Sequence, residues 1–290
     1  NVFEREKERM LPLYQGMMAT FYNHRAADIV RSATATKRQN QPRYLDKPEL
    51  QDPARVVFPG YWVSDREIPA GLPEWLVAFS SISSPTNERS MVAYPLPLVA
   101  VGNSTPLIIA KDHGLALLAT LSSFVLDYSL RQKLGGVNLN YTYVQQLPVP
   151  SPGLFELRAA WSPRDSIESW IRRRVLELSY TSFDMASFAR ANGYPGVPFT
   201  WSDQRRPLIR AELDAAFFHL YGIHRDDVDY IMDTFPIVKR KDEAEFGEYR
   251  TKRMILEIYD AIQDAIDSGG VYESPLDAGD RRNPTRKRAR

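Results

Sequence analysis

Hydrophobic residues recur at helical spacing in the last third of the chain. The apolar positions of the first such stretch lie three or four residues apart: Leu213, Ala216, Phe217, Leu220 and Tyr221. This spacing predicts a helix, and Gly222 follows where a C-terminal cap is expected. A short helix is predicted over Asp226–Met232, because Pro236 follows as a stop.

One more amphipathic helix is predicted before the chain ends. Apolar residues return every three or four positions from Tyr249 to about Asp267, and Gly269-Gly270 follow them. That pattern predicts a helix with a single buried stripe. The segment between these helices, Ile237–Glu248, is highly charged, so we expect a loop there.

Further helices are predicted in the middle of the chain. Gly114–Leu134 is mostly apolar and predicts one long helix, with Arg131 and Lys133 at its C-terminal end, where positive charge suits the helix dipole. Ser162–Asp165 has the composition of an N-cap with proline at the first helical position, and predicts a helix to about Leu178. A shorter helix is expected over Ser182–Ala191.

Strands are predicted in the first part of the chain. The runs Arg55–Ser64, Trp75–Ile82 and Met91–Val101 are rich in β-branched and aromatic residues and are punctuated by Pro and Gly. Such runs are typical of an antiparallel sheet or an open barrel. The prolines within them indicate sheet edges or bulges.

These elements predict a mixed α/β chain of the α+β class. We expect residues 1–24 to be a linker, residues 25–150 a β-rich domain with a long inserted helix, residues 151–268 a helical module, and residues 269–290 a basic disordered tail. The preferred boundary is the Pro-rich exit at 148–153.

Composition excludes several classes of function. The chain has no Cys, which excludes disulfides, thiolate metal ligands and a Cys nucleophile, and fits a reducing cytoplasm. Its four His residues are isolated and no HExxH word occurs, so no metal site is expected. No phosphate-binding GxxxxGK[ST] loop and no apolar run of the ~20 residues that a membrane span needs is present. We therefore expect neither a membrane protein nor a P-loop ATPase.

Charge is distributed unevenly along the chain. The net charge is +1, but the last ten residues carry six Lys and Arg and no acid, and removing these six charges leaves −5. A DNA-binding face must then come from local segregation of charge. The stretch from Ile29 to Leu45 has no acid and holds Arg31, Lys37, Arg38 and Arg43, and Arg89 ends the polar loop 80–90. Such a stretch could follow a phosphate backbone, or be an ordinary solvated loop.

Three sequence words point to one family. They are LPLYQGMMATFYNHRAA at 11–27, LRQKLGGVNLNYTYVQQLPVP at 130–150, and LDAAFFHLYGI with DDVDYIMDTFPIVKRKDEAEFGEYRTKRMILEIYDA between 213 and 261. They resemble the C-terminal region of large adenine-specific DNA methyltransferases, which include fused restriction-methylation enzymes and the methyltransferases of phage-defence systems. Met17 departs from the basic residue that this family carries after the glycine.

The resemblance implies a target-recognition region that binds double-stranded DNA. The chain has neither the glycine-rich turn after a strand that holds S-adenosylmethionine nor the Asn/Asp-Pro-Pro-aromatic word that grips the adenine. We therefore expect no catalytic residue and no cofactor here; S-adenosylmethionine would belong to a catalytic methyltransferase domain or subunit outside these residues. The chain does not begin with Met, and we expect it to be part of a longer protein.

Two sets of residues are the candidates for DNA contact. Phosphate contacts are expected from Arg31, Lys37, Arg38, Arg43, Arg89, Arg131 and Lys133, and base contacts from Asn138, Asn140 and Tyr141. The alternative for the second set is ordinary strand and turn polarity. His24, in the His-Arg pair of the first word, is expected to be a hydrogen-bonded core histidine rather than a catalytic base.

Two functions therefore remain open. The chain is a DNA target-recognition module, as the acid-poor windows favour, or a non-catalytic module that docks a partner subunit of a DNA-modification or defence complex. The residues before the last ten carry a net charge of −5, and this negative charge keeps the second hypothesis open.

Overall fold

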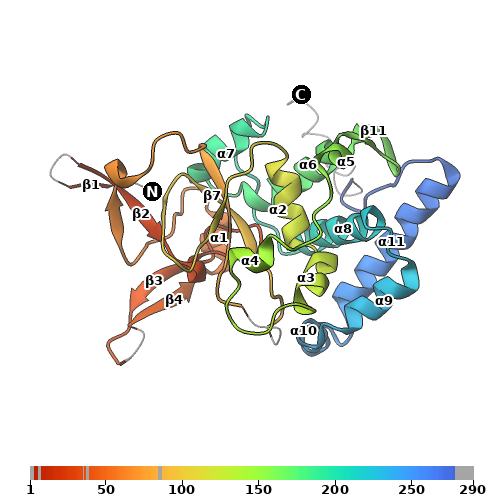
Figure 1. The fold of residues 1–290 in the computed structure, drawn as a ribbon, viewed down its shortest axis with the longest axis horizontal. Coiled ribbons are helices and arrows are strands. Elements are labelled where there is room, and N and C mark those ends of the chain that lie inside the picture. Colours follow the sequence, from red (N-terminus) through yellow and green to blue (C-terminus); the bar gives the residue numbers. More distant parts are fainter. Residues whose placement is uncertain (1–2, 6–7, 35, 37–38, 84–86, 278–290) are drawn as a thin grey trace.

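The structure confirms the expected α+β class, with most strands at one end of the molecule and the helices at the other (Figure 1). It is a computed structural model that describes residues 3–5, 8–34, 36, 39–83 and 87–277. Among the helices of these residues, none combines the length and the apolar character needed to cross a bilayer.

The strands form small sheets. β2 lies between β1 and β5 as antiparallel neighbours and pairs in parallel with β8; β3 and β4 form a hairpin; β6 lies between β7 and β9; β10 pairs with β11. Their bounds are β1 Phe3–Arg5, β2 Glu8–Tyr14, β3 Ala27–Arg31, β4 Asn40–Tyr44, β5 Trp62–Ser64, β6 Trp75–Phe79, β7 Ala93–Pro97, β8 Ala100–Val101, β9 Leu107–Ile108, β10 Arg158–Ala159 and β11 Ser162–Ser166.

Helices follow the strands along the chain. The α-helices are α1 Lys47–Gln51, α2 Gly114–Ser122, α3 Phe124–Arg131, α4 Tyr141–Val144, α5 Pro152–Glu156, α6 Ile167–Ser179, α7 Ala186–Ala191, α8 Arg205–Leu220, α9 Arg225–Asp233, α10 Pro236–Phe246 and α11 Arg250–Ser268. Single 3-10 turns cover Gly16–Met18, Asp65–Glu67 and Phe183–Met185. The helices α8, α9 and α11 confirm the helices that were predicted from the apolar periodicity of the C-terminal region. Gly222 and Gly269 adopt the positive φ that is typical of residues that end a helix.

The strand β6 separates two hydrophobic cores. Leu76 and Ala78 face a smaller core with Tyr14, whereas Val77 and Phe79 face a larger core shared with the helices. Alternate side chains of a strand point to opposite faces, so a continuous apolar run fits a strand buried on both sides. The sheet β7-β6-β9 is therefore the wall between the strand-rich end and the helical end.

The larger core crosses the expected domain boundary at residue 150. It extends in sequence from Tyr22 to Leu276 and includes α2 and α3 together with α6, α8 and α11. Residues 8–24 are not a linker either, because β2 is part of a sheet and Tyr14 and Met18 are buried. The larger core therefore joins residues on both sides of the expected boundary, and β6 lies between it and the smaller core.

The segment after α11 packs on the helices. Glu212 of α8 is buried and accepts hydrogen bonds from the hydroxyls of Tyr272 (2.9 Å) and Ser274, and from Arg174 Nε at 2.7 Å. The sequence predicted a disordered tail from residue 269, but residues 271–277 are packed against the helices. The six basic residues at the end of that tail lie outside the described residues.

The predicted long helix over Gly114–Leu134 is two helices. Ser123 has an extended backbone, and its hydroxyl donates to Thr120 O at 2.8 Å and accepts from Leu126 N at 3.4 Å. Asp214 Oδ1 of α8 accepts from Phe124 N at 2.8 Å. A side chain close in sequence and one far away thus satisfy the free N–H groups that start α3, which stabilises the break.

Other local predictions differ from the structure. The charged segment expected as a loop forms α10, which begins at Pro236, a residue well suited to a first helical turn. Ser162–Asp165 belongs to β11, and Ser166 caps α6 instead, through a 3.1 Å bond from Ser169 N. Tyr141–Val144 form the short helix α4, so Asn140 lies at a helix N-cap and not in a strand. Each error is local and leaves the order of the larger elements unchanged.

The break between α2 and α3 can be tested by replacing Ser123 with Ala. The cap hydroxyl is buried, so its loss should lower the free energy of unfolding by about 1 kcal/mol. Chemical denaturation followed by circular dichroism measures the change. Ser129→Ala is the control, because Ser129 only bonds back to Val125 O within the same helix; equal effects of the two substitutions would contradict a capping role for Ser123.

Candidate nucleic-acid interface

A polar groove lies between the β3–β4 hairpin and the turn at residues 103–104. Its volume is about 850 Å³, and residues 15–17, 59–61 and 82 complete its lining. The hairpin projects from the body at the end opposite α11 (Figure 1). The groove is therefore at the strand-rich end of the molecule.

The register of the hairpin decides which side chains enter the groove. Arg31 pairs with Asn40 and Ile29 with Pro42, so these residues share one face of the hairpin. Asp28 with Arg43, and Val30 with Gln41, share the other face. The face with Arg31 and Asn40 lines the groove.

Two glycines allow the walls of the groove to approach each other. Gly16 N donates to Ser104 Oγ at 3.1 Å, and a Cβ on Gly16 would lie 2.8 Å from Ser104 O. A Cβ on Gly60 would lie 3.0 Å from the Ile29 side chain and 3.1 Å from that of Asn40. Gly16 is the glycine of the Leu-Tyr-x-Gly word, and the structure gives it a packing role.

The groove has the chemistry of a surface for a polar, anionic ligand. Among its lining side chains, all within the described residues, there is no carboxylate, and the charged one is Arg31. Gln39 Oε1 accepts from Arg31 Nε at 3.1 Å and from Nη2 at 2.7 Å, which holds the guanidinium across the hairpin. Amides and hydroxyls supply further donors and acceptors: Gln15, Gln39, Asn40, Tyr61, Asn103 and Ser104.

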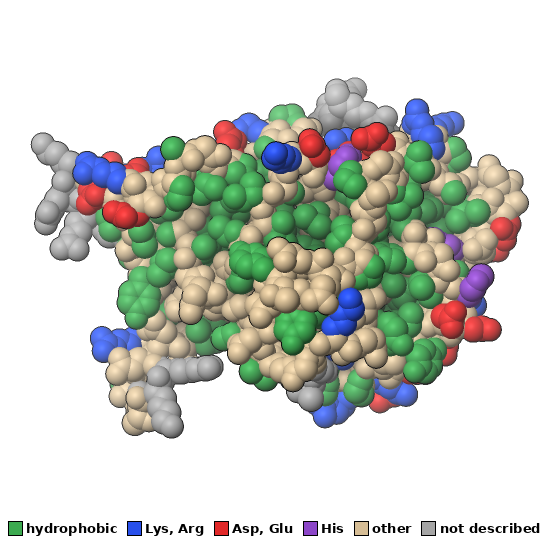
Figure 2. Space-filling model, viewed as in Figure 1, with side chains coloured by type: hydrophobic (Ala, Val, Ile, Leu, Met, Phe, Trp, Pro, Cys, Tyr) green, Lys and Arg blue, Asp and Glu red, His purple; other side chains and the backbone are tan. Residues whose placement is uncertain are grey.

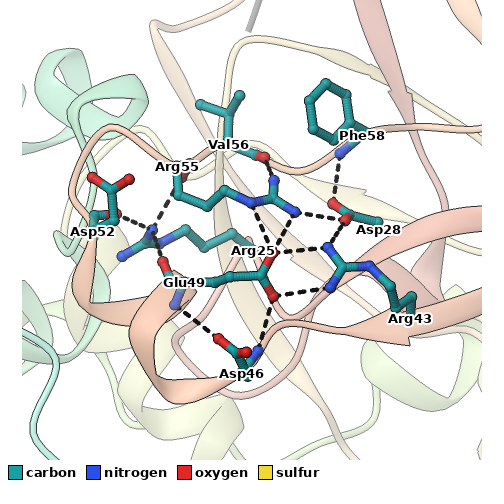
Figure 3. A network of polar contacts seen from close by, with 9 residues as sticks. All are labelled: Arg25, Asp28, Arg43, Asp46, Glu49, Asp52, Arg55, Val56 and Phe58. Carbon is teal, nitrogen blue, oxygen red and sulfur yellow. Dashed lines mark hydrogen bonds and ion pairs between the residues drawn. The ribbon is translucent and has the colours of Figure 1, made fainter.

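A network of ion pairs anchors the other face of the hairpin (Figure 3). Asp28 of β3 accepts from Arg43 of β4 and from Arg55 Nη2 at 2.6 Å. Glu49 of α1 binds both guanidiniums, Arg43 Nη2 at 2.8 Å and Arg55 Nη2 at 3.0 Å. These bonds, with Arg43 first, lower the pKa of Glu49 to about 2. Arg43, expected to contact phosphate, is therefore held by two carboxylates.

Beneath this network, Arg25 is fully buried and bonded to backbone carbonyls (Figure 3). Its guanidinium donates to Leu50 O (2.6 Å), Asp52 O (2.8 Å), Arg55 O (3.0 Å) and, more weakly, Glu49 O (3.3 Å). It also donates to Thr181 O at 2.7 Å, in the segment that follows α6. One side chain thus joins the loop behind the hairpin to the helical end of the molecule.

His24 forms a second link beside it. His24 Nε2 lies 3.0 Å and 3.1 Å from the two carboxylate oxygens of Asp184 and 3.3 Å from Ser182 Oγ. Burial alone would raise the pKa of Asp184, but the charge of His24 and the bonds from His24 and Ser182 hold it well below its usual range. One ring nitrogen makes all three contacts, whereas a nucleophile, base and carboxylate triad uses both nitrogens. His24 is a hydrogen-bonded core histidine, as expected.

Two predicted phosphate contacts prove to be internal. Arg89 is 3% exposed; its Nε donates to Asp127 Oδ2 at 2.7 Å, and its Nη2 donates to Ser122 O at 2.6 Å. Arg131 donates to Asn87 O and Glu88 O and lies 4.2 Å from the centre of the Phe235 ring. Both guanidiniums are bound by partners within the protein that come from segments distant in sequence.

The remaining candidates are divided between the groove and α4. Asn138 forms a β-bridge with Ile82, which lines the groove, so it lies at the groove's rim. Asn140 caps α4 through Tyr143 N, Tyr141 bonds Leu107 through its hydroxyl, and Lys133 Nζ donates to Gln146 O at 3.0 Å. Around α4 the surface shows mostly backbone and uncharged polar side chains, with apolar patches among them (Figure 2). Lys37 and Arg38 lie outside the described residues.

Sequence reasoning missed most of the groove. Gln15, Gln39, Asn40 and Tyr61 are ordinary polar residues in three separate segments, and no local pattern connects them. The one available signal was the polar turn Asn103–Thr105, together with the glycine of the Leu-Tyr-x-Gly word, which meet at the groove floor.

Comparisons with known proteins were made for the whole chain. No match was found. This holds for protein-family models, for curated proteins and for solved structures alike. The resemblance to adenine-specific methyltransferases therefore depends on the three sequence words alone. Among the described residues, no group of three or more His, Asp or Glu is arranged to hold a metal ion.

The role of Arg25 can be tested by replacing it with Gln. Several buried carbonyls would lose their donor, so the free energy of unfolding should fall by at least about 3 kcal/mol. Thermal and urea unfolding measure the change. Arg66→Gln is the control, since the side chain of Arg66 is 78% exposed. If Arg25→Gln lowered the free energy of unfolding as little as this control, the hydrogen bonds of Arg25 would not be what stabilises the fold.

The Asp184–His24 pair predicts a pH dependence of stability. Because the pKa of Asp184 is depressed in the folded state, its contribution is present above the unfolded pKa of about 4 and is lost as the pH falls below it. Asp184→Asn should therefore lower stability by roughly 2 kcal/mol at pH 7, and the gap to the wild type should narrow below pH 4. Urea unfolding from pH 3 to pH 8 measures both; a gap that is constant with pH would exclude the depressed pKa.

Proposed function

We propose that this chain is the target-recognition part of a site-specific adenine DNA methyltransferase and binds duplex DNA along the polar groove. The observation that carries the proposal is the lining of the groove, where amides, hydroxyls and one guanidinium meet without a carboxylate. The sequence that connects β3 and β4 also contains Lys37 and Arg38 and no acid.

These groups suit the two kinds of contact that duplex recognition requires. Gln and Asn side chains can bond adenine through two hydrogen bonds in the major groove, and Arg pairs with guanine or with phosphate. Phosphate contacts give affinity and register, whereas base-edge contacts give sequence preference. In the proposed division, Arg31 contributes to the first, and Asn40 and Asn138 contribute to the second.

Methyl transfer itself would take place on a catalytic domain or subunit outside these residues. The chain has no Asn/Asp-Pro-Pro-aromatic word and no glycine-rich strand turn. S-adenosylmethionine would bind that domain, and the role of this chain would be to place the target adenine near it.

A second candidate, docking of a partner protein, is favoured by an apolar surface around α4. Four apolar side chains there are well exposed: Ile82 (59%), Ile109 (56%), Val137 (58%) and Tyr141 (49%). Ile82 also lines the groove, so the apolar surface borders it. A catalytic domain bound to this apolar surface would lie next to the bound DNA. The two candidate functions are then compatible, because they use two different surfaces of the same module.

Replacing Arg31 with Gln tests the DNA groove. Loss of one phosphate contact should weaken binding to all duplexes similarly, and should reduce the slope of log K against log salt by about one. Asn40→Ala should instead cost about 1–3 kcal/mol on a selected preferred sequence and little on others. Fluorescence anisotropy with selected and scrambled duplexes at several salt concentrations measures both effects.

Arg253→Gln is the matched control. It removes an arginine of similar exposure on α11, where Glu248 and Glu257 bind it, at the far end of the molecule (Figure 1). Duplex affinity should not change with this variant. Unchanged affinity in Arg31→Gln as well, or no duplex binding by the wild-type chain, would favour partner docking as the function.

A further inference from the structure

A second cavity lies where the strand-rich end meets α8, and its lining contains three arginines. We call it the arginine pocket; it has a volume of about 400 Å³ and is lined by Phe21, Arg89, Trp201, Arg206 and Arg210, with Thr20, Asn87, Glu88 and Val92. It shares no lining residue with the polar groove. A ligand of the arginine pocket would therefore contact none of the residues that line the polar groove.

Helix geometry and aromatic rings hold two of these arginines in place. Arg206 and Arg210 are four residues apart on α8, so they project from the same face. The Arg206 guanidinium carbon lies 3.7 Å from the centre of the Trp201 ring, and that of Arg210 lies 5.2 Å from the centre of the Phe21 ring. The ring contacts occupy the flat faces of the guanidiniums and leave N–H groups at their edges for a ligand.

Three carboxylates near the pocket already have partners: two bind lysines, and one accepts from a backbone N–H. Glu88 binds Lys241 Nζ at 2.6 Å, and Asp203 binds Lys47 Nζ at 2.9 Å. Asp214, one turn beyond Arg210 on α8, accepts from Phe124 N. Among the described residues, neither Arg206 nor Arg210 has a carboxylate within ion-pair distance, and the Arg206 guanidinium donates to Leu178 O at 2.6 Å.

The third arginine presents an unused donor. Arg89 is 3% exposed and its Nε is paired with Asp127, but its Nη1 is buried without a hydrogen-bond partner among the described residues. A buried donor of this kind is unfavourable unless a ligand satisfies it. Burial, followed by the charge of Arg210, lowers the pKa of Arg206 to about 9; burial and the charge of Arg89 lower that of Arg210. The fold thus holds like charges together where an anion would stabilise them.

We propose that the arginine pocket binds a phosphate group. Forked guanidinium donors match the oxygens of phosphate, and Thr20 and Asn87 add neutral side chains to the same cavity. The adjoining cavity of about 430 Å³ does not suit an anion, because Asp203, Asp214, Asp242 and Glu245 line it. The phosphate comes either from the backbone of DNA or from a free phosphate or phosphate monoester.

The first experiment titrates the full chain with inorganic phosphate at constant ionic strength, with chloride as the reference anion. A phosphate concentration tenfold above Kd should raise Tm by about 3 °C relative to chloride. Because phosphate also stabilises proteins by exclusion from their surface, the readout is the difference between wild type and variant. Arg210→Gln should weaken phosphate affinity at least tenfold, and Arg210→Lys should retain part of it.

Arg225→Gln is the control, because Arg225 is exposed and paired with Asp260 at 3.0 Å; it should leave the phosphate effect unchanged. Circular dichroism confirms that each variant is folded, and Arg206→Gln replaces Arg210→Gln if the latter is not.

A second arm identifies the source of the phosphate. Weaker duplex binding by Arg210→Gln, with a smaller salt slope, identifies the DNA backbone, whereas unchanged duplex binding with lost inorganic phosphate binding identifies a free phosphate or ester. The proposal is overturned if Arg210→Gln and Arg206→Gln change neither phosphate nor duplex binding. This result is distinguishable from failure of the proposed function, which depends on Arg31 and the polar groove.

Discussion

The buried guanidinium of Arg25 is the interaction on which the arrangement of the two ends depends. It satisfies carbonyls of α1 and of the loop that follows α1 and, at the same time, the carbonyl of Thr181 beyond α6. A single charged group with this many backbone partners is well satisfied despite its burial. The segment that it fixes carries Glu49 of α1 and Arg55 of the following loop, and both bind the β3–β4 hairpin.

Buried acids on α8 have the corresponding role in the helical end. Glu212 binds Arg174 and the segment after α11, and Asp214 satisfies the start of α3. Asp214 lies in the word that resembles the methyltransferase family, and Glu212 immediately precedes this word. These residues therefore have an architectural role, which explains why a recognisable word can occur far from any catalytic group.

The polar groove and the arginine pocket differ in how they are built. The groove is formed by a projecting hairpin and turns, and Gln39 holds Arg31 across the hairpin. The pocket is formed on α8 against rings of Phe21 and Trp201, within the junction between the two ends. The two sites use separate residues of the chain.

The sequence by itself determined the class of the fold and the helices α8, α9 and α11, because apolar periodicity and helix-ending glycines are local properties. It also indicated correctly that His24 is a core residue. Only the tertiary structure decided which cations are free. Arg89 and Arg43 lie in windows poor in acid, yet Asp127, Asp28 and Glu49 reach them through the fold. Likewise, the groove combines residues from five segments. Local composition gives the charge of a window, but the partner of each charge depends on long-range packing.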